Sequence, residues 1–383
     1  MKKIIFIVND SHSLYHYRRE LVLDLSKKYK VFAILPKNKL NDSISKSLNI
    51  KIYEIDMLRF FSFKTDIISL IQLFKIFLFN RFDIVHTITI KPNIYGILAS
   101  FFFVKRRIAM ITGAGSLFDA RNPINGKIRK NIAIKLYKLG LTLSTKVIFQ
   151  NDEDAKLFHQ MGLVSKSKIK LIEGSGVNKD EFTNNLNFTK EISKIKKKYK
   201  IINKNVIICI ARMIKSKGVV EFSQLAYLMK DKNITFILIA PFDKNYNLGE
   251  KVQRKDIYKF NSSNLVVINK FVHDIRPFLK LSSISILLST YREGVPRFLI
   301  ESLSMSLPII TYNSSGCNLT VKNNHNGYLV DRNTDVEKIS ILINNIFKNK
   351  KLKLKFERNS RDLFLKKFES KRIISKTKKV YLD

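Results

Sequence analysis

Two glutamates in the C-terminal half of the chain have a spacing and a setting that suit the binding of a phosphorylated sugar. Glu293 and Glu301 follow the apolar, β-branched run Ile284–Leu288, which is typical of a strand buried in a parallel sheet. Between them, Gly294 lets the backbone approach a ligand closely, and Pro296 has the fixed φ that suits a first helical turn. The sequence therefore predicts a strand-to-helix loop that carries two carboxylates.

The start of this predicted helix offers free N–H groups and the positive end of the helix dipole, which favour an anion or a ring of hydroxyls. Both carboxylates can reach one pocket, because helical side chains lean toward the N-terminus of their helix. Carboxylates bind hydroxyls while N–H groups and cations bind phosphate, so the pattern indicates a sugar-nucleotide site. A plainer alternative stays open, because Arg297 and Glu301 also have the i,i+4 spacing of a surface ion pair and Glu293 could be an ordinary helix cap.

A second group of charges follows the predicted strand Val206–Ala211. Arg212 offers a bidentate fork and Lys217 a point charge, and both stand in a short loop that leads through Gly218 into a helical pattern. Together these two cations could balance a departing nucleoside diphosphate without a metal. Taken on its own, in a chain this basic, the loop is better explained as a solvated basic turn.

Three loops, at residues 212–218, 293–301 and 313–316, are expected at the carboxyl edge of one sheet. With these motifs the chain resembles the retaining glycosyltransferases of family four. Their GT-B fold has two Rossmann-like, doubly wound parallel-sheet domains that face each other across a cleft. The resemblance covers nearly the whole chain, and it implies transfer of a hexosyl or N-acetylhexosaminyl group with retention of configuration and without a metal.

The resemblance also implies a role for each matched residue. Arg212 and Lys217 would bind the donor diphosphate, because they have the family's spacing. Glu293, the first glutamate of an E-x7-E motif, would contact the transferred sugar, and Glu301 would contact the ribose of the nucleotide. The predicted catalytic residues are Arg212, Lys217 and Glu293, and the predicted donor-binding residues are Glu301, Gly294, Val295, Arg297 and Gly115.

Other motifs resemble the branch of this family that acts on lipid-linked sugars in bacterial surface-glycan assembly; they lie at residues 112–116, 149–151, 174–178 and 326–330. Two departures concern the acceptor side. The first loop lacks the glycine-rich turn that relatives often carry, and Ile88 stands where many have a second histidine. The acceptor-side candidates are His86 and His16. We expect His86 at the end of a strand, where it either orients the acceptor or caps the sheet.

Strand-like and helical runs alternate along the chain, which predicts an α/β protein with two parallel sheets of about six strands each. The expected strands are 4–8, 31–35, 52–55, 84–87, 107–111, 147–149, 206–211, 235–240, 265–268, 284–288, 309–312 and 328–330, and helices are expected at 17–29, 65–79, 93–103, 127–143 and 151–161. At 383 residues, two domains are the default. The expected parts are an N-terminal acceptor domain over 1–182, a linker over 183–205, a donor-nucleotide domain over 206–365, and a basic C-terminal helix over 366–383 that could cross back to the N-terminal domain.

The chain is strongly basic, with 70 Lys and Arg against 31 Asp and Glu and a net charge of +39. Such a charge indicates an anionic partner, and the candidates are nucleic acid, an anionic membrane surface or phosphorylated substrates. Part of the excess reflects a richness in Lys, Asn and Ile that AT-rich coding would produce. No aromatic-basic motif or known reader module accompanies the charge, so we expect no nucleic-acid partner.

Two segments favour contact with a membrane surface. The apolar stretch from Leu58 to Phe82 contains scattered cations, and charges that interrupt it argue against a spanning helix. The predicted helix 127–143 combines basic residues with an apolar stripe, which fits either a core helix with a solvated face or a helix lying on anionic lipid. The stripe consists of Ile128, Ile132, Leu136, Leu139 and Leu143, and its basic neighbours are Lys127, Arg129, Lys130, Lys135 and Lys138. We expect peripheral attachment to an anionic membrane.

Neither a disulfide framework nor a metal site is expected. The two cysteines are too few for such a framework, and the N-terminus predicts a strand in place of a signal peptide. We therefore expect a cytoplasmic protein on the inner face of the plasma membrane. Asp152-Glu153-Asp154 has the D-x-D form that binds a metal in another glycosyltransferase fold, but it opens a predicted helix, so we interpret these acids as helix-capping. His12 and His16 lack metal-ligand spacing with other histidines, and phosphate or acceptor contacts are favoured for them.

We therefore expect a glycosyltransferase that moves a sugar from a nucleoside-diphosphate donor, a UDP-sugar, to a lipid-linked or glycan acceptor in bacterial surface-polysaccharide synthesis. Departure of the diphosphate leaves oxocarbenium-like charge on the sugar, so the protein would stabilise the diphosphate and position the acceptor hydroxyl. Two rivals stay open. A sugar-nucleotide epimerase shares the fold but releases a free product, and a nucleic-acid-binding protein is motivated by the charge alone.

Overall fold

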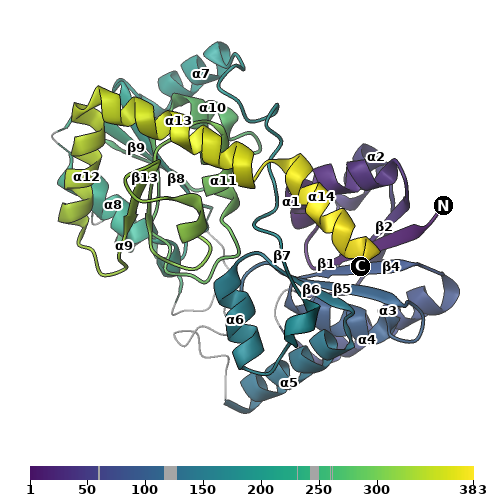
Figure 1. The fold of residues 1–383 in the computed structure, drawn as a ribbon. Coiled ribbons are helices and arrows are strands. Elements are labelled where there is room, and N and C mark those ends of the chain that lie inside the picture. Colours follow the sequence, from purple (N-terminus) through teal and green to yellow (C-terminus); the bar gives the residue numbers. More distant parts are fainter. Residues whose placement is uncertain (59–60, 116–126, 231, 242–249, 259, 261) are drawn as a thin grey trace. The chain divides into compact units, whose positions relative to one another are not determined.

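The computed structural model describes residues 1–58, 61–115, 127–230, 232–241, 250–258, 260 and 262–383. The chain forms two compact units, one made of residues 1–176 and 370–383 and the other of residues 177–369 (Figure 1). The segment expected as a linker, 183–205, contains helix α7 (Thr189–Tyr199) and belongs to the second unit, because Ile195 and Tyr199 pack against that unit's core. Helix α14 (Ser370–Leu382) belongs to the first unit.

The first unit is built on a parallel sheet of seven strands in the order β3-β2-β1-β4-β5-β6-β7. The strands are β1 Lys3–Val8, β2 Lys30–Pro36, β3 Lys51–Ile55, β4 Ile84–Ile88, β5 Arg106–Ile111, β6 Lys146–Phe149 and β7 Ile169–Leu171. The helices are α1 Ser11–Ser26, α2 Asn41–Leu48, α3 Phe63–Phe79, α4 Ile97–Ser100, α5 Lys127–Leu143, α6 Asp152–Gln160 and α14, with a π-helical turn, η1, at Pro92–Gly96 and a 3-10 turn, η3, at Lys166–Lys168.

Helices cover both faces of this sheet, because successive strand residues point to opposite sides. Ile5 and Ile7 pack with residues of α3, α4, α5 and α6 in one core. Ile4 and Phe6 pack with residues of α1, α2 and α14 in the other core. Apolar, β-branched strands buried on both faces are typical of a doubly wound parallel sheet.

The second unit repeats this plan with a six-stranded parallel sheet in the order β10-β9-β8-β11-β12-β13. The strands are β8 Asn205–Ile210, β9 Ile234–Ile239, β10 Leu265–Ile268, β11 Ile284–Leu287, β12 Ile309–Tyr312 and β13 Gly327–Val330. The helices are α7, α8 Val219–Leu228, α9 Arg254–Tyr258, α10 Arg276–Leu281, α11 Arg297–Ser304, α12 Val336–Lys348 and α13 Lys350–Lys367, with 3-10 turns η4 at Lys215–Lys217 and η5 at Asn318–Thr320.

The expected α/β class with two Rossmann-like parallel sheets is confirmed. Each expected strand is present with nearly the expected ends, and β7 adds a seventh strand to the first sheet. The segment expected as one helix at 93–103 begins as the π-helical turn and continues as α4. Among the described residues, no helix is both long enough and apolar enough to pass through a bilayer.

Candidate functional site

The loop after β8 is fixed in place by hydrogen bonds to two other segments. The backbone N–H of Ser216 donates to Oε2 of Glu250 at 3.0 Å, and its carbonyl accepts the N–H of Thr290 at 2.8 Å. Gly218 follows with a φ of +71°, and a Cβ there would run into the backbone carbonyl of Leu288. The loop after β8 and the loop after β11 therefore pack directly against each other.

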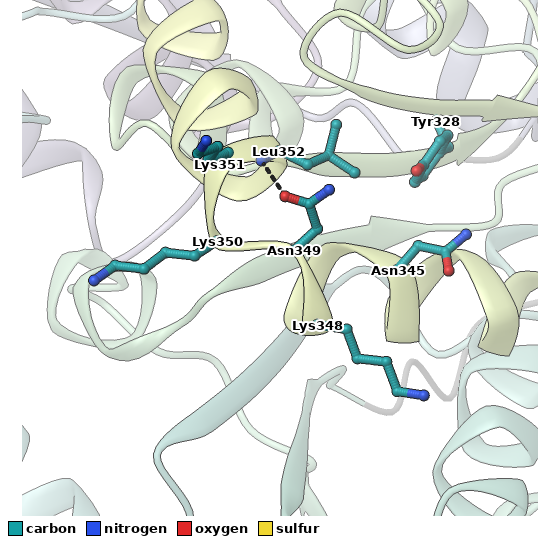
Figure 2. A pocket seen from close by; sticks show the side chains of 7 residues that line it. All are labelled: Tyr328, Asn345, Lys348, Asn349, Lys350, Lys351 and Leu352. Carbon is teal, nitrogen blue, oxygen red and sulfur yellow. Dashed lines mark hydrogen bonds between the residues drawn. The ribbon is translucent and has the colours of Figure 1, made fainter.

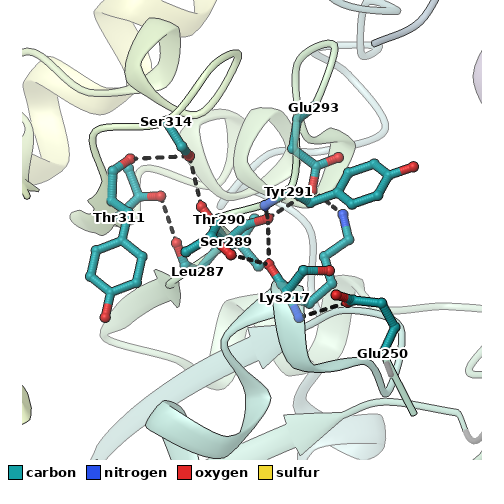
Figure 3. A network of polar contacts seen from close by, with 11 residues as sticks. Lys217, Glu250, Leu287, Ser289, Thr290, Tyr291, Glu293, Thr311 and Ser314 are labelled. Carbon is teal, nitrogen blue, oxygen red and sulfur yellow. Dashed lines mark hydrogen bonds and ion pairs between the residues drawn. The ribbon is translucent and has the colours of Figure 1, made fainter. Parts of the chain in front are cut away.

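Lys217 and Glu293 form an ion pair across these two loops, and Figure 3 shows their side chains pointing toward one another. Oε1 of Glu293 also accepts a hydrogen bond from the hydroxyl of Ser289 at 3.1 Å. Burial lowers the pKa of Lys217; the carboxylate of Glu293 opposes this shift and the charge of Arg212 adds to it. The site thus holds a partly desolvated cation next to a carboxylate.

Arg212 lies close to this ion pair, because Arg212 and Lys217 both contact one aromatic ring. The ring centroid of Tyr291 is 5.3 Å from Cζ of Arg212 and 5.2 Å from Nζ of Lys217. Cation–π contacts at these distances hold the two cations near each other. The structure therefore brings together Arg212, Lys217 and Glu293, the three residues predicted to be catalytic.

Arg297 and Glu301 form an ion pair of 2.8 Å in the first turns of α11. Glu301 is 9% exposed, so this i,i+4 pair is mostly buried and is not an ordinary surface pair. Burial raises the pKa of Glu301, and Arg297 opposes that shift. The first turns of α11 therefore hold a largely buried carboxylate beside a guanidinium.

The third expected loop, at residues 313–316, lies against the second. The hydroxyl of Ser314 donates to the carbonyl of Ser289 at 2.7 Å. Gly316 has a φ of +78°, and a Cβ there would collide with the carbonyl of Gly294. Val295, the next residue, is buried. The three loops thus form one edge of the second sheet, and Arg212, Lys217, Glu293 and Glu301 lie among them.

Gly115, the remaining donor-side candidate, belongs to the first unit and follows β5 with a φ of +67°. Its loop is anchored by the backbone N–H of Ala114, which donates to Oδ2 of Asp154 at 2.9 Å. The other donor-side candidates all belong to the second unit.

The acceptor-side candidates also lie in the first unit. His86 lies in the middle of β4, so the expectation that it ends a strand is wrong. It is fully buried, and its Nδ1 is 2.6 Å from the hydroxyl of Tyr381 in α14. Burial lowers the pKa of His86 to about 3, so the ring is neutral near pH 7. His16 stands on α1 with its ring centroid 3.9 Å from that of His12.

The D-x-D segment is used structurally in the first turn of α6. Asn151 caps this helix by accepting the N–H of Asp154 at 2.7 Å, and Asp152 pairs with Lys156 at 2.5 Å. Within the described parts of the chain, no group of three His, Cys, Asp or Glu side chains could hold a metal ion. Both cysteines are free and buried.

An open hollow of about 510 Å³ lies at the junction of α12 and α13 (Figure 2). Its basic side chains, Lys348, Lys350 and Lys351, are all exposed to solvent. None of the predicted site residues lines this hollow.

Three residues that support the site were not found from the sequence. Tyr291 lies under both cations, Glu250 fixes the loop after β8, and Asp154 fixes the loop that contains Gly115. The position of Tyr291, two residues before Glu293, was the only available signal. Long-range partners such as Glu250 have no local pattern.

Two protein-family descriptions match most of the chain between them. Residues 191–363 match the family "Glycosyl transferases group 1", and residues 3–151 match "Glycosyl transferase 4-like". The chain is also 25% identical over 361 residues, 94% of its length, to the N,N'-diacetylbacillosaminyl-diphospho-undecaprenol alpha-1,3-N-acetylgalactosaminyltransferase of Campylobacter jejuni, of which 93% is covered. It is 24% identical over 83% of its length to the UDP-Gal:alpha-D-GlcNAc-diphosphoundecaprenol alpha-1,3-galactosyltransferase of Escherichia coli, of which 80% is covered.

Solved structures share the fold over the full length. A glycosyltransferase from Rickettsia africae superposes with a TM-score of 0.80 at 20% identity, covering 99% of this chain and 98% of that one. Anabaena Alr3699/HepE in complex with UDP-glucose superposes with a TM-score of 0.78 at 17% identity, covering 99% of this chain and 100% of that one.

Proposed function

We propose that this chain, which belongs to the GT-B glycosyltransferases with a 4-like N-terminal half and a group 1 C-terminal half, moves a sugar from a UDP-sugar to a lipid-linked acceptor in bacterial surface-polysaccharide synthesis. The names of two relatives specify undecaprenol-linked acceptors, and one of them specifies a UDP-sugar donor. These relatives are transferases, which favours transfer to an acceptor over the epimerase alternative.

The observation that carries this proposal is the convergence of Arg212 and Lys217 on the ring of Tyr291, with Glu293 paired to Lys217. Two cations at the edge of a parallel sheet can balance the charge that develops on a departing diphosphate. Glu293 would then accept hydroxyls of the transferred hexose or N-acetylhexosamine, and Glu301 would accept the ribose hydroxyls. In this assignment, Gly294, Val295 and Arg297 line the donor side.

The same cations support a reaction without a metal, because they supply the positive charge that a divalent ion would otherwise supply. Retention of configuration is proposed from the family resemblance. Two measurements test these points. Activity is expected to survive dialysis against EDTA, and the product's anomeric configuration by NMR is expected to equal that of the donor. Dependence on added Mg²⁺ or Mn²⁺, or an inverted anomer, would refute the corresponding point.

The setting proposed for this reaction is the inner face of the plasma membrane, with an anionic membrane surface and no nucleic acid as partner. A lipid-linked acceptor places the reacting hydroxyl at a membrane surface. The net charge of +39 is the feature that a nucleic-acid rival depends on, and anionic lipid accounts for it equally well.

The transfer itself is tested with the purified protein, a panel of UDP-sugars and a membrane lipid extract, with mass spectrometry of the products. We expect Lys217→Gln and Glu293→Gln to lower the rate by about 10²-fold or more, because each removes a charge at the reacting diphosphate or sugar. Lys215→Gln is the matched control, since Lys215 is an exposed lysine in the same turn. Full activity of Lys217→Gln would remove the site assignment, and a free product without a labelled acceptor would favour the epimerase.

A further inference from the structure

Helix α3 turns an apolar face toward solvent. Its exposed side chains recur every three or four residues, the spacing of one helical face, and they include Phe63, Ile67, Ile71, Phe74, Leu78 and Phe79. Phe63 is 85% exposed and Phe79 is 78% exposed, so these rings lie almost entirely in water. The side of α3 that faces the sheet is the more polar one: it buries Asp66 and Ser69 beside Leu73 and Phe77. The apolar surface is therefore additional to what the core requires.

The turn that follows α4 extends this apolar face. Phe102 in this turn is 84% exposed. The ring of Phe103 meets the ring of Phe74 at a centroid distance of 5.2 Å, which joins the turn to α3. Contiguous exposed apolar patches on a protein surface mark sites of interaction. We call the exposed side of α3 together with Phe101 and Phe102 the apolar face.

The exposed charges on the apolar face itself are lysines, and the carboxylate at its edge is paired: Asp56 contacts Lys37 at 2.9 Å and accepts a hydrogen bond from Gln72 of α3. Lys64 and Lys75 are exposed on α3 among the apolar residues, and Lys105 is exposed beyond Phe102. Asp66 is the only acidic residue in the sequence of α3, and it is buried in an ion pair with Lys91 at 2.5 Å. No acidic residue occurs between residues 97 and 107. Within the described residues, the face therefore combines exposed aromatic rings with lysines and carries no exposed acid of its own.

We infer that this apolar face is the surface by which the protein docks on an anionic lipid bilayer, with the rings inserted at the depth of the headgroups and the lysines paired with lipid phosphates. Aromatic side chains suit the membrane interface, and lysines on such a face can reach the headgroups by extending their side chains. The charge favours this partner over a second copy of the chain. A symmetric contact through the same face would bring Lys64 and Lys75 against another basic chain.

On α5, part of the apolar stripe predicted from the sequence is also exposed, and α5 packs in the same core as α3. Ile132 and Leu139 are exposed, while Ala133, Tyr137 and Leu141 face the core that α5 shares with α3. The side chain of Ile128, and those of Lys127, Arg129 and Lys130, lie outside the described part of the structure. Only the exposed part of the stripe is therefore relevant to docking.

Tryptophan fluorescence tests the docking face directly, because the chain contains no Trp. Phe79→Trp places the probe on the apolar face, and Ile202→Trp places it on the second unit at a residue that is 90% exposed. With phosphatidylcholine–phosphatidylglycerol vesicles, the emission of Phe79→Trp is expected to shift to the blue and to be quenched when brominated phosphatidylcholine is included. The emission of Ile202→Trp is expected not to change.

Two matched pairs of variants separate the apolar and the charged contributions. Phe63→Ser with Phe79→Ser and Phe102→Ser is expected to lower partitioning into these vesicles at least about tenfold, whereas Ile202→Ser with Ile341→Ser and Leu354→Ser leaves it unchanged. Lys64→Glu with Lys75→Glu is expected to lower it at least about thirtyfold on anionic vesicles, because each lysine near the surface contributes about 1 kcal/mol and each glutamate adds repulsion. Lys196→Glu with Lys197→Glu on α7 makes the same change in net charge and is expected to have a much smaller effect.

Two results would overturn the inference. Equal quenching of both Trp probes would place the contact on another surface. Absence of vesicle binding, together with a dimer in sedimentation that the triple Phe→Ser variant dissociates, would assign the face to a second copy of the chain. The inference rests on the proposed membrane-bound acceptor, but its test uses neither donor nor acceptor. Failure here with transfer to detergent-solubilised lipid intact would therefore leave the proposed function standing.

Discussion

At the scale of single residues, the buried ammonium of Lys217 should make nucleotide binding depend on pH. Burial lowers its pKa below the ordinary value of 10.5, although the carboxylate of Glu293 opposes the shift. A base with a lowered pKa is fully charged at low pH and loses its proton as the pH rises through that lowered value. We therefore expect the affinity for UDP to be constant near neutral pH and to fall in the alkaline range before pH 10.5. Isothermal titration of UDP between pH 7 and pH 10 measures this.

The variant Lys217→Arg is the control for this prediction, because a guanidinium keeps its charge throughout the range. Its affinity at pH 7 should be lower than that of the wild type, since a planar fork replaces a point charge. The alkaline decrease should be absent in this variant. An equally steep decrease in both proteins would assign it to another group.

The partner of Lys217 should matter for stability as well as for catalysis. Glu293→Ala leaves the Lys217 ammonium largely buried without its carboxylate, which costs on the order of 3 kcal/mol when such a pair is broken. We expect urea unfolding to show this loss, and the double variant Lys217→Met with Glu293→Ala to regain part of it. No regain would mean that Glu293 stabilises the loop through Ser289 and not through the ion pair. A loss of activity in Glu293→Ala is therefore not by itself a measure of catalysis.

At the scale of elements, helix α14 completes the first unit although it is the last segment of the chain. It buries Ile373, Val380 and Tyr381 in the core shared with α1 and α2, and Tyr381 holds His86. Tyr381→Ala is expected to destabilise the protein by about 3–5 kcal/mol, because it opens a cavity and removes the partner of a buried ring. Leu382→Ala is the control, since Leu382 is exposed, and urea unfolding compares the two. Similar midpoints for both variants would show that α14 is not part of the core.

Most strands were predictable because they are short runs rich in apolar and β-branched residues, separated by enough sequence for a helix. Helix α2 was not predicted, because its polar sequence buries only Asn41, Ile44 and Leu48. The burial of His86 could not be predicted either. It depends on a tyrosine far away in the sequence, and no periodicity links the two residues.

The charged residues of the site were predictable from their spacing. The aromatic ring that contacts both cations was not. Strand-to-helix loops on parallel strands meet at one edge, so Arg212, Lys217 and Glu293 were expected close together. Tyr291 contacts both cations through its ring, an interaction that side-chain type alone does not reveal. The sequence also did not predict that Asp66 is buried in an ion pair with Lys91. Because of this burial, the exposed face of α3 carries no acidic residue of its own.

At the scale of the whole molecule, the net charge and the apolar face act on an anionic membrane over different distances. The net charge of +39 attracts any polyanion, and salt screens it over about 8 Å at physiological ionic strength. The apolar face of α3 acts only in contact and is not screened. Together they imply that salt weakens the approach to an anionic membrane more than it weakens a docked state.

The two units have separate cores, so they are expected to unfold in two transitions in calorimetry. The residues predicted to bind diphosphate and ribose all belong to the second unit, so UDP should raise the midpoint of one transition only. At 100 times its Kd, a ligand that binds only the native state adds about 2.7 kcal/mol to the stability of the part that binds it. Lys217→Gln should reduce this shift, and Tyr381→Ala should lower the midpoint of the other transition while leaving the shift intact. A single transition that UDP raises as a whole, or a UDP-dependent shift in the transition that Tyr381→Ala lowers, would mean that nucleotide binding is not confined to the second unit.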